Sequence, residues 1–317
     1  MKILITDKMA KEAIELLKDA GHEVTFDEMD GETLLKKVSG YDALMVRGRT
    51  KAVKEIVEAG AGGNIKVIGR AGIGVDNIDV ETAAQHGIPV VNAPTGATSS
   101  VAELAIGHML SLSRHLSKAD RTMKNGEWAK KQLKGNELYG KTLGLIGCGN
   151  IGRMTGKLAQ AFGMNVIGYD PFISRENMKK DAFEKMDELA DLMQQSDFIS
   201  LHLPHLPKTH HIVNKEMIAK MKPTAFIINC ARGGTIDEKA LYEALKKQKI
   251  AGAGLDVYEQ EPPKDNPLLT LDSVMLTPHI GANTKEGQIR AGTVCAEQIL
   301  KVLDGKEPDF CVNKHLL

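Results

Sequence analysis

Three side chains with complementary chemistry, Arg232, Glu261 and His279, lie in three separate loop-like stretches of the sequence. An arginine suits a carboxylate ligand, because its planar guanidinium can donate two parallel hydrogen bonds and polarise a neighbouring carbonyl. A histidine suits proton transfer, because its charge changes near physiological pH. A nearby carboxylate favours the protonated imidazole. Together these residue types suit the interconversion of an alcohol and a ketone.

Each of these residues also has a purely structural interpretation. His279 could be a packed loop histidine, and Arg232 could pair with a surface carboxylate. Glu259 competes with Glu261 for the acidic role. Pro262 and Pro263 would stiffen the loop that holds Glu261. The spacing alone therefore does not assemble the three residues.

A glycine-rich motif indicates a nucleotide site. Residues 142–146 read as a short buried strand, and Gly147-Cys148-Gly149-Asn150-Ile151-Gly152 follows directly in the pattern G-x-G-x-x-G. Residues 153–162 then show helical spacing, and 165–169 read as a second strand. In such a motif Gly147 permits a tight turn, Gly149 admits a pyrophosphate, and Gly152 lets the helix pack closely. The helix start presents unpaired N–H groups to the phosphates.

Asp170 follows the second predicted strand, 18 residues after Gly152. A carboxylate there can accept hydrogen bonds from both ribose hydroxyls and repels a 2′-phosphate. The motif therefore predicts NAD rather than NADP. A glycine turn without a ligand is the alternative, and the flanking strand, helix and acid count against it.

The elements that would position these residues alternate between strand and helix. Strands are predicted at 2–6, 23–26, 43–46, 67–69, 90–92, 197–201, 224–229, 251–255 and 274–276. Helices are predicted at 10–20, 31–38, 100–114, 186–195, 215–221, 238–247 and 285–303, and residues 60–63 read as a loose connection. We expect a Rossmann-type doubly wound NAD-binding domain over residues 98–284. Residues 1–97 and 285–317 would form a smaller flavodoxin-like α/β substrate domain.

Arg47 and Arg70 follow predicted strand ends, the second within a glycine-rich turn with Gly72 and Ile73. Ligands of open α/β sheets bind outside the carboxyl ends of strands. Arginine at such a place suits a carboxylate or a phosphate. For Arg49, a solvated surface position is as good an explanation as a ligand contact.

Bulk composition excludes several classes of protein. At 317 residues the chain suits two domains, and its 41 basic and 41 acidic residues leave no net charge to attract nucleic acid or an anionic membrane. The four cysteines show no zinc-site spacing, so we expect no metal and a reduced, cytoplasmic setting. The sequence opens on a predicted strand that is too short for the apolar region of a signal peptide, and no apolar run approaches the length of a membrane span, so we expect neither. His108, His115, His205, His210 and His211 read as packed or surface histidines.

The sequence resembles the D-isomer-specific 2-hydroxyacid dehydrogenases over nearly its whole length. The resemblance rests on residues 69–77 with Asp79, and on 91–94, 101–103, 141–152, 228–234, 254–262 and 277–282. It implies an oxidoreductase whose catalytic residues are Arg232, Glu261 and His279, because the Glu-Pro pair at 261–262 selects Glu261 over Glu259. It implies NAD contacts from Gly147, Gly149, Asn150, Ile151, Gly152, Asp170, Cys230, Ala231, Arg232, Asp256, His279, Gly281 and Ala282. Asp256 would hold the nicotinamide carboxamide.

Within the family, the resemblance is greatest to members that oxidise 3-phospho-D-glycerate to 3-phosphohydroxypyruvate in serine biosynthesis. It implies substrate contacts from Arg47, Arg70, Gly72, Ile73 and Lys130. Lys130 replaces an arginine supplied across a homodimer, which would form through the helix near 100–120 and the loop around Trp128. Ala97 and Ala282 are further departures from the family pattern.

Two alternatives stay open. One is a reductase of glyoxylate, hydroxypyruvate or another small 2-keto acid, and the other is an NAD-sensing scaffold like the corepressors of this family. Formate and phosphite dehydrogenases share the fold but fit poorly with Arg47 and Arg70 both present. Because the sequence ends at Leu317, we expect no serine-binding regulatory domain and no inhibition by serine through one.

Overall fold

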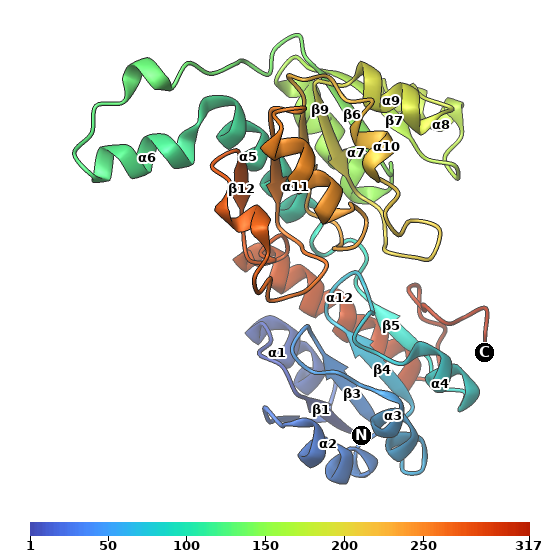
Figure 1. The fold of residues 1–317 in the computed structure, drawn as a ribbon. Helices are drawn as coiled ribbons and strands as arrows, with labels where there is room; N and C mark the ends of the chain where they lie inside the picture. The colour runs from blue at the N-terminus through green and yellow to red at the C-terminus, as the bar shows by residue number, and fades with distance from the viewer. The chain divides into compact units, whose positions relative to one another are not determined.

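The computed structural model describes residues 1–317 and divides into two compact units. One unit comprises Met1–Thr98 and Ala282–Leu317, and the other comprises Ser99–Gly281. The chain passes between them in the first turn of α5 (Thr98–Arg114). The predicted α/β class is confirmed, since both units are parallel sheets covered by helices (Figure 1). None of the helices is long and apolar enough to cross a lipid bilayer.

The first unit contains a five-stranded parallel sheet in the order β2-β1-β3-β4-β5. This is the strand order of flavodoxin-like folds. The strands are β1 (Lys2–Ile5), β2 (Glu23–Phe26), β3 (Ala43–Val46), β4 (Val67–Arg70) and β5 (Val90–Asn92). The helices are α1 (Lys11–Asp19), α2 (Gly31–Lys37), α3 (Lys54–Ala61), α4 (Val80–Gln85) and α12 (Lys285–Leu303), with a 3-10 turn η1 (Val38–Gly40).

Helices cover both faces of this sheet, which explains why its strands are nearly continuous apolar runs. Ile3 and Ile5 point to the face covered by α1 and α12, where they pack with Leu17 and Ile299. Leu4 points to the other face, which α2, α3 and α4 cover. The unit is therefore discontinuous in sequence, because α12 comes from the end of the chain.

The second unit contains a seven-stranded parallel sheet in the order β12-β11-β10-β9-β6-β7-β8. This is the Rossmann order with one added strand, and the strand order reverses between β6 and β9, where such folds bind dinucleotides. The strands are β6 (Thr142–Ile146), β7 (Asn165–Tyr169), β8 (Glu184–Lys185), β9 (Phe198–Leu201), β10 (Phe226–Asn229), β11 (Gly252–Leu255) and β12 (Val274–Leu276).

Helices α9 (Leu189–Gln195), α10 (Lys215–Ile218) and α11 (Glu238–Lys246) bury Leu192, Ile218 and Leu241 on one face of this sheet. The unit also contains α7 (Asn150–Ala161), α8 (Arg175–Lys180) and the 3-10 turns η2 (Lys130–Gln132) and η3 (Pro267–Thr270). Helix α6 (Leu116–Lys124) contacts the β12 edge through Ser117 and Arg121, and the helix and the coil after it extend outward from there (Figure 1).

Three predictions of local structure were wrong. The helix predicted at 215–221 ends at Ile218, because the chain continues in turns closed by the Met221 N–H bond to the Ile218 carbonyl. Gly60 and Ala61 are not a loose connection but the last turn of α3, where Gly60 is buried on the sheet together with Ile56 and Val57. Helix α9 starts at Leu189 rather than Met186, because the Met186 N–H still donates to the Gly168 carbonyl, 2.8 Å away, beyond the end of β8.

Candidate active site

The glycine motif forms a tight turn at the carboxyl end of β6. Gly147 has φ +92°, a conformation that favours glycine, and its N–H donates to the Tyr169 carbonyl over 2.9 Å. A Cβ at Gly152 would lie 2.2 Å from the Gly147 oxygen, so α7 packs directly on the turn. Gly149 caps α7, and a Cβ there would meet no atom within 4 Å. No side chain caps this helix start, so its first N–H groups suit a pyrophosphate.

Asp170 follows β7 and binds the same turn. Its Oδ2 accepts the Cys148 N–H over 2.9 Å, and its Oδ1 accepts the Phe172 N–H over 2.8 Å. Each carboxylate oxygen has a second lone pair, so both can still accept a ribose hydroxyl. Burial, assisted by the charge of Asp170, raises the pKa of the Cys148 thiol to about 12. Cys148 therefore stays neutral and is no nucleophile.

His279 and Glu261 form a direct pair. His279 Nδ1 lies 2.7 Å from Glu261 Oε2, and Glu261 Oε1 accepts the Tyr258 N–H over 3.1 Å. The His279 side chain is 50% exposed, and the bond at Nδ1 leaves Nε2 as the ring atom that can exchange a proton. Glu259 instead bonds His211 Nε2 over 2.9 Å and the Glu238 N–H over 3.1 Å. The structure thus pairs Glu261, not Glu259, with His279.

The electrostatics of this pair favour a carboxylate facing an imidazolium. The hydrogen bond that His279 donates to Glu261 raises the pKa of His279. The charges of Glu261 and Asp256 raise it further, whereas burial and Arg232 act to lower it. Burial acts to raise the pKa of Glu261, but the bond and charge of His279, the Tyr258 N–H and Arg232 outweigh it and lower that pKa. A raised imidazole pKa at a half-exposed position is typical of a proton-transfer group.

A buried amide shapes the loop that carries Arg232. Asn229, the last residue of β10 and 2% exposed, donates to the Arg232 carbonyl over 2.9 Å and accepts the Ala231 N–H over 3.0 Å. The half-buried Arg232 donates from Nη1 to the Ala231 carbonyl over 2.7 Å. Cys230 in the same loop is buried, which raises the pKa of its thiol. The loop therefore presents Arg232 as its charged group.

Asp256 follows β11 and is 1% exposed. Its Oδ1 accepts the Ile280 N–H and its Oδ2 accepts the Gly281 N–H, each over 2.8 Å. Its main-chain oxygen accepts the His279 N–H over 2.8 Å. Asp256 thus holds the loop that carries His279. Its predicted contact with a nicotinamide carboxamide stays a prediction, as do the other cofactor contacts, including that of Ala282, the first residue of the last stretch of the other unit.

Arg47 and Arg70 lie together in the first unit, since Val46 of β3 is paired with Arg70 of β4. Arg70 Nε donates to the Arg47 carbonyl over 3.1 Å. A Cβ at Gly72 would lie 1.8 Å from Arg70 Nη1, so the guanidinium occupies space that only glycine leaves free. Burial lowers the pKa of Arg47, against the effect of Asp7. Ile73 contributes its carbonyl to Asn92 Nδ2 over 2.6 Å.

Arg49 has a structural role. Its side chain bonds the Thr6 carbonyl, the Met29 carbonyl over 3.2 Å and Asp7 Oδ1 over 3.3 Å. Asp7, 3% exposed, also accepts the Arg47 N–H and the Thr50 hydroxyl. The remaining predicted substrate residue, Lys130, is exposed. It belongs to the second unit, whereas Arg47 and Arg70 belong to the first.

Two structural residues of the site were not predicted from the sequence, Asn229 and Asp7. Each is a polar residue at the carboxyl end of a buried strand, and that position was the available signal. The three histidines without an assigned role form a chain of contacts that ends at Glu259. His205 Nε2 lies 3.0 Å from His210 Nδ1, and the rings of His210 and His211 stack with centroids 3.9 Å apart.

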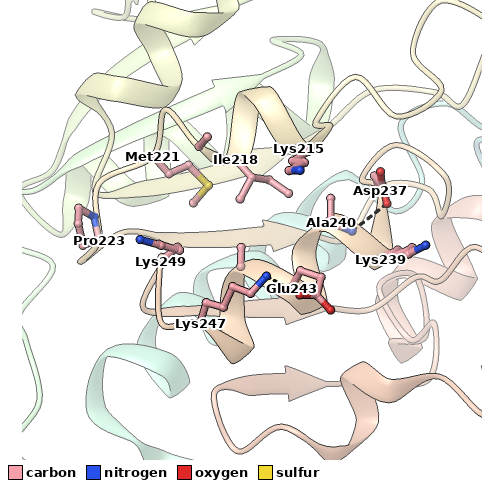
Figure 2. A pocket seen from close by; sticks show the side chains of 12 residues that line it. Lys215, Ile218, Met221, Pro223, Asp237, Lys239, Ala240, Glu243, Lys247 and Lys249 are labelled. Atoms are coloured by element: carbon pink, nitrogen blue, oxygen red, sulfur yellow. Dashed lines mark hydrogen bonds and ion pairs between the residues drawn. The ribbon is translucent and has the colours of Figure 1, made fainter.

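A groove of about 680 Å³ lies between α10 and α11, away from these residues (Figure 2). Ile218, Met221 and Ala244 contribute apolar lining, and the lysines at its rim are Lys215, Lys239, Lys247 and Lys249. No predicted site residue lines this groove. No group of three or more His, Cys, Asp or Glu side chains is arranged to hold a metal ion.

Comparisons with known proteins match the second unit and the whole chain to one family. The model of the D-isomer specific 2-hydroxyacid dehydrogenase NAD-binding domain matches residues 106–281. A D-3-phosphoglycerate dehydrogenase of Methanocaldococcus jannaschii is 53% identical over 313 residues, which are 99% of this chain but 59% of that protein. A hydroxypyruvate reductase of Thermotoga maritima is 49% identical over 306 residues, which are 95% of this chain and 98% of that protein.

Among solved structures, a glyoxylate reductase from Paecilomyes thermophila superimposes with a TM-score of 0.89 at 31% identity, covering 99% of each chain. The chain spans about 59% of the length of the phosphoglycerate dehydrogenases from Methanocaldococcus jannaschii and Archaeoglobus fulgidus.

Proposed function

Because this chain belongs to the D-isomer-specific 2-hydroxyacid dehydrogenases, we propose that it is an NAD-dependent enzyme that oxidises 3-phospho-D-glycerate to 3-phosphohydroxypyruvate. The observation that carries the reaction class is the 2.7 Å contact between His279 Nδ1 and Glu261 Oε2, with the pKa of His279 raised by that bond. The 53% identity to a D-3-phosphoglycerate dehydrogenase supports the substrate.

The geometry of the second unit fits the cofactor. The open space in front of Gly149 and the uncapped start of α7 suit the pyrophosphate, and Asp170 suits the adenosine ribose. Asn150 and Ile151 would offer N–H groups, and the remaining contacts would come from Cys230, Ala231, Arg232, Asp256, His279, Gly281 and Ala282. When bound, NAD supplies the acceptor for the hydride that leaves C2 of the hydroxy acid.

Three side chains would carry the proton and the substrate charge. Neutral His279 accepts the proton of the C2 hydroxyl at Nε2, and Glu261 stabilises the imidazolium that forms. Arg232 donates hydrogen bonds to the substrate carboxylate and to the C2 oxygen as it becomes a carbonyl. In the reverse direction the imidazolium returns its proton to that oxygen.

The first unit would supply the groups that bind the phosphate and carboxylate. Arg47 and Arg70 lie at neighbouring strand ends, and Gly72 leaves room for the Arg70 guanidinium. Lys130 would complete the phosphate site from the partner subunit of a homodimer. The apolar side chains exposed around α6 support such a dimer, with Leu116 51%, Met123 55% and Trp128 78% exposed. Four free cysteines support a reducing, cytoplasmic location.

A second function is favoured by one observation. The hydroxypyruvate reductase of Thermotoga maritima is 49% identical to this chain over 306 residues, nearly as similar as the phosphoglycerate dehydrogenase at 53%. Reduction of hydroxypyruvate or glyoxylate would use the same His279, Glu261 and Arg232 chemistry. The phosphate contacts therefore distinguish the two functions.

The test is an NADH oxidation assay with 3-phosphohydroxypyruvate, hydroxypyruvate, glyoxylate, pyruvate and 2-oxoglutarate. We expect kcat/KM for the phosphorylated acid to exceed the others at least tenfold, about 1.4 kcal/mol of transition-state binding. Arg47→Ala should remove most of that preference. A preference for hydroxypyruvate or glyoxylate would establish the reductase instead, and absence of turnover with every acid would reject the enzymatic proposal.

A further inference from the structure

A buried histidine outside the predicted site is connected to the loop that carries His279. His108 lies in the middle of α5, is 1% exposed, and its Nε2 lies 3.1 Å from the Thr277 hydroxyl. That hydroxyl lies 2.6 Å from Asp256 Oδ1. Asp256 in turn accepts the N–H groups of Ile280 and Gly281. The contacts therefore run without a break from α5 to the residues that follow His279.

The protons in this chain can be assigned by elimination. Asp256 as a carboxylate can only accept, so the Thr277 hydroxyl must donate its one proton across the 2.6 Å contact. The same oxygen can then only accept from His108, so His108 Nε2 carries a proton. Burial lowers the pKa of His108, against the effect of Asp256, which keeps the ring neutral. His108 is thus the neutral tautomer with a bare Nδ1.

The bare Nδ1 has a cost that packing alone does not explain. It is buried and has no hydrogen-bond partner. It lies against β11, since a Cβ at Gly254 would be 2.8 Å from it. An unsatisfied buried acceptor is unfavourable, and an apolar side chain of similar size would avoid it. Unsatisfied groups of this kind persist at functional positions.

We propose that His108 is a positioning residue of the active site, which fixes the Asp256 carboxylate through the Thr277 hydroxyl and thereby holds the His279 loop in register. The inference rests on the proposed function, because the His279 loop matters only if His279 transfers the proton. Asp256 is the central group, since it accepts the Thr277 hydroxyl, two N–H groups of the loop and, at its main-chain oxygen, the His279 N–H. His279 itself has φ +51°, so its loop needs such restraint.

The test compares His108→Leu, His108→Gln, Thr277→Val and the His108→Leu/Thr277→Val double variant. Gln places a donor N–H near the position of His108 Nε2, whereas Leu keeps only the volume. We expect His108→Leu to lower kcat for keto-acid reduction threefold to tenfold with little change in KM. The pH at which reduction declines should move downward, because a less well held Asp256 supports the His279 imidazolium less. The urea midpoint should stay equal or rise, since the bare Nδ1 is gone.

The three remaining variants test the path. His108→Gln should recover at least half of the lost kcat. If the effect of His108 passes through Thr277, the double variant should be no more than twofold worse than Thr277→Val alone. Ser111→Ala is the matched control, because Ser111 is also buried on α5 and contacts Met275 of β12, 3.6 Å away, without touching Thr277 or Asp256.

Three kinetic results would overturn the proposal: an unchanged kcat and pH profile in His108→Leu, a loss of kcat that follows a lowered urea midpoint and is not recovered by Gln, or losses that multiply in the double variant. Amide hydrogen exchange separates this inference from the proposed function. The Ile280 and Gly281 amides should exchange at least tenfold faster in His108→Leu whatever the substrate proves to be. Unchanged exchange rejects the positioning role, and a wild-type protein without turnover rejects only the enzymatic function.

Discussion

Replacing Glu261 by glutamine isolates the charge of the carboxylate that faces His279. The new side chain can keep the contact with the Tyr258 N–H only through its amide oxygen, which turns its NH₂ group toward His279 Nδ1. That nitrogen can accept from the amide only when it is unprotonated. Glu261→Gln therefore disfavours the imidazolium twice, by removing a charge and by placing a donor where His279 needs an acceptor.

The size of the effect follows from the hydrogen bond that is lost. A hydrogen bond to a charged group contributes about 1.5–3 kcal/mol, which corresponds to roughly 10–150-fold in rate at about 1.4 kcal/mol per factor of ten. The His279 side chain is 50% exposed and Glu261 37% exposed, so water screens the pair. We therefore expect the rate of reduction to fall by the lower part of that range, roughly 10–30-fold, at a pH where the histidine of the variant is neutral.

Whether the rate falls or rises with pH depends on the direction of the reaction. Reduction needs protonated His279, and its rate is lost as pH rises through the His279 pKa. Glu261 raises that pKa, so the variant should lose reduction at lower pH than the wild type, with a small deficit at acidic pH. Oxidation needs neutral His279, so its rising limb should move to lower pH as well. The two directions thus shift together along the pH axis.

The assay is a pH series of kcat for both directions, with Glu259→Gln as the matched control. Glu259 lies on the same loop but bonds His211 and Glu238, so its substitution should leave the pH limbs in place. If Glu261→Gln and Glu259→Gln have the same profile as the wild type, Glu261 does not set the protonation of His279. If both variants shift equally, the effect belongs to the loop and not to the pair.

Three further perturbations test the cofactor site, the glycine turn and the dimer. Asp170→Ser should raise kcat/KM with NADP relative to NAD at least tenfold. It should also weaken the binding of NAD, because the bonds of Asp170 to the Cys148 and Phe172 N–H groups are lost. A constant ratio of kcat/KM for the two cofactors would contradict the role of the carboxylate. Gly152→Ala should lower the free energy of unfolding in urea by about 1–3 kcal/mol, because its Cβ would lie 2.2 Å from the Gly147 oxygen. An unchanged urea unfolding curve would mean that the turn moves to accommodate the Cβ. Met123→Lys should shift sedimentation velocity profiles toward monomer, and a wild-type profile would place the dimer contact elsewhere.

The sheets could be predicted well because their strands are buried on both faces and read as short apolar runs. The ranges of β2, β3, β5, β6, β7, β12 and α12 agree with the prediction at both ends. Short helices with little buried surface were not predicted. In α8 only Met178 is buried, so its sequence gives little apolar signal. In α6 the residues Leu116, Ala119 and Met123 do recur at helical spacing, and that helix was missed although its pattern was present.

The site could be predicted in its residue types but not in its contacts. Glu259 and Glu261 are equivalent by spacing, and they are distinguished only because the folded loop directs Glu259 to His211 and Glu261 to His279. His108 was predicted to be either a packed or a solvated helix histidine, and the structure buries it. Its bond to Thr277 spans 169 residues of sequence, and no local pattern reports such a contact.

Polar residues at the carboxyl ends of buried strands link the prediction of the sheets to the prediction of the site. Three of them accept main-chain N–H groups from a neighbouring loop: Asp7 from Arg47, Asp170 from Cys148, and Asp256 from Ile280 and Gly281. Asn229 accepts the Ala231 N–H of its own loop. A polar residue directly after an apolar run therefore predicts a loop anchor as strongly as it predicts a ligand contact. Asp170 and Asp256 carry both interpretations at once, so lost activity in a variant of either residue mixes a lost ligand contact with a displaced loop. Amide exchange of the loop in the absence of ligand separates these two effects, because only the displaced loop changes it.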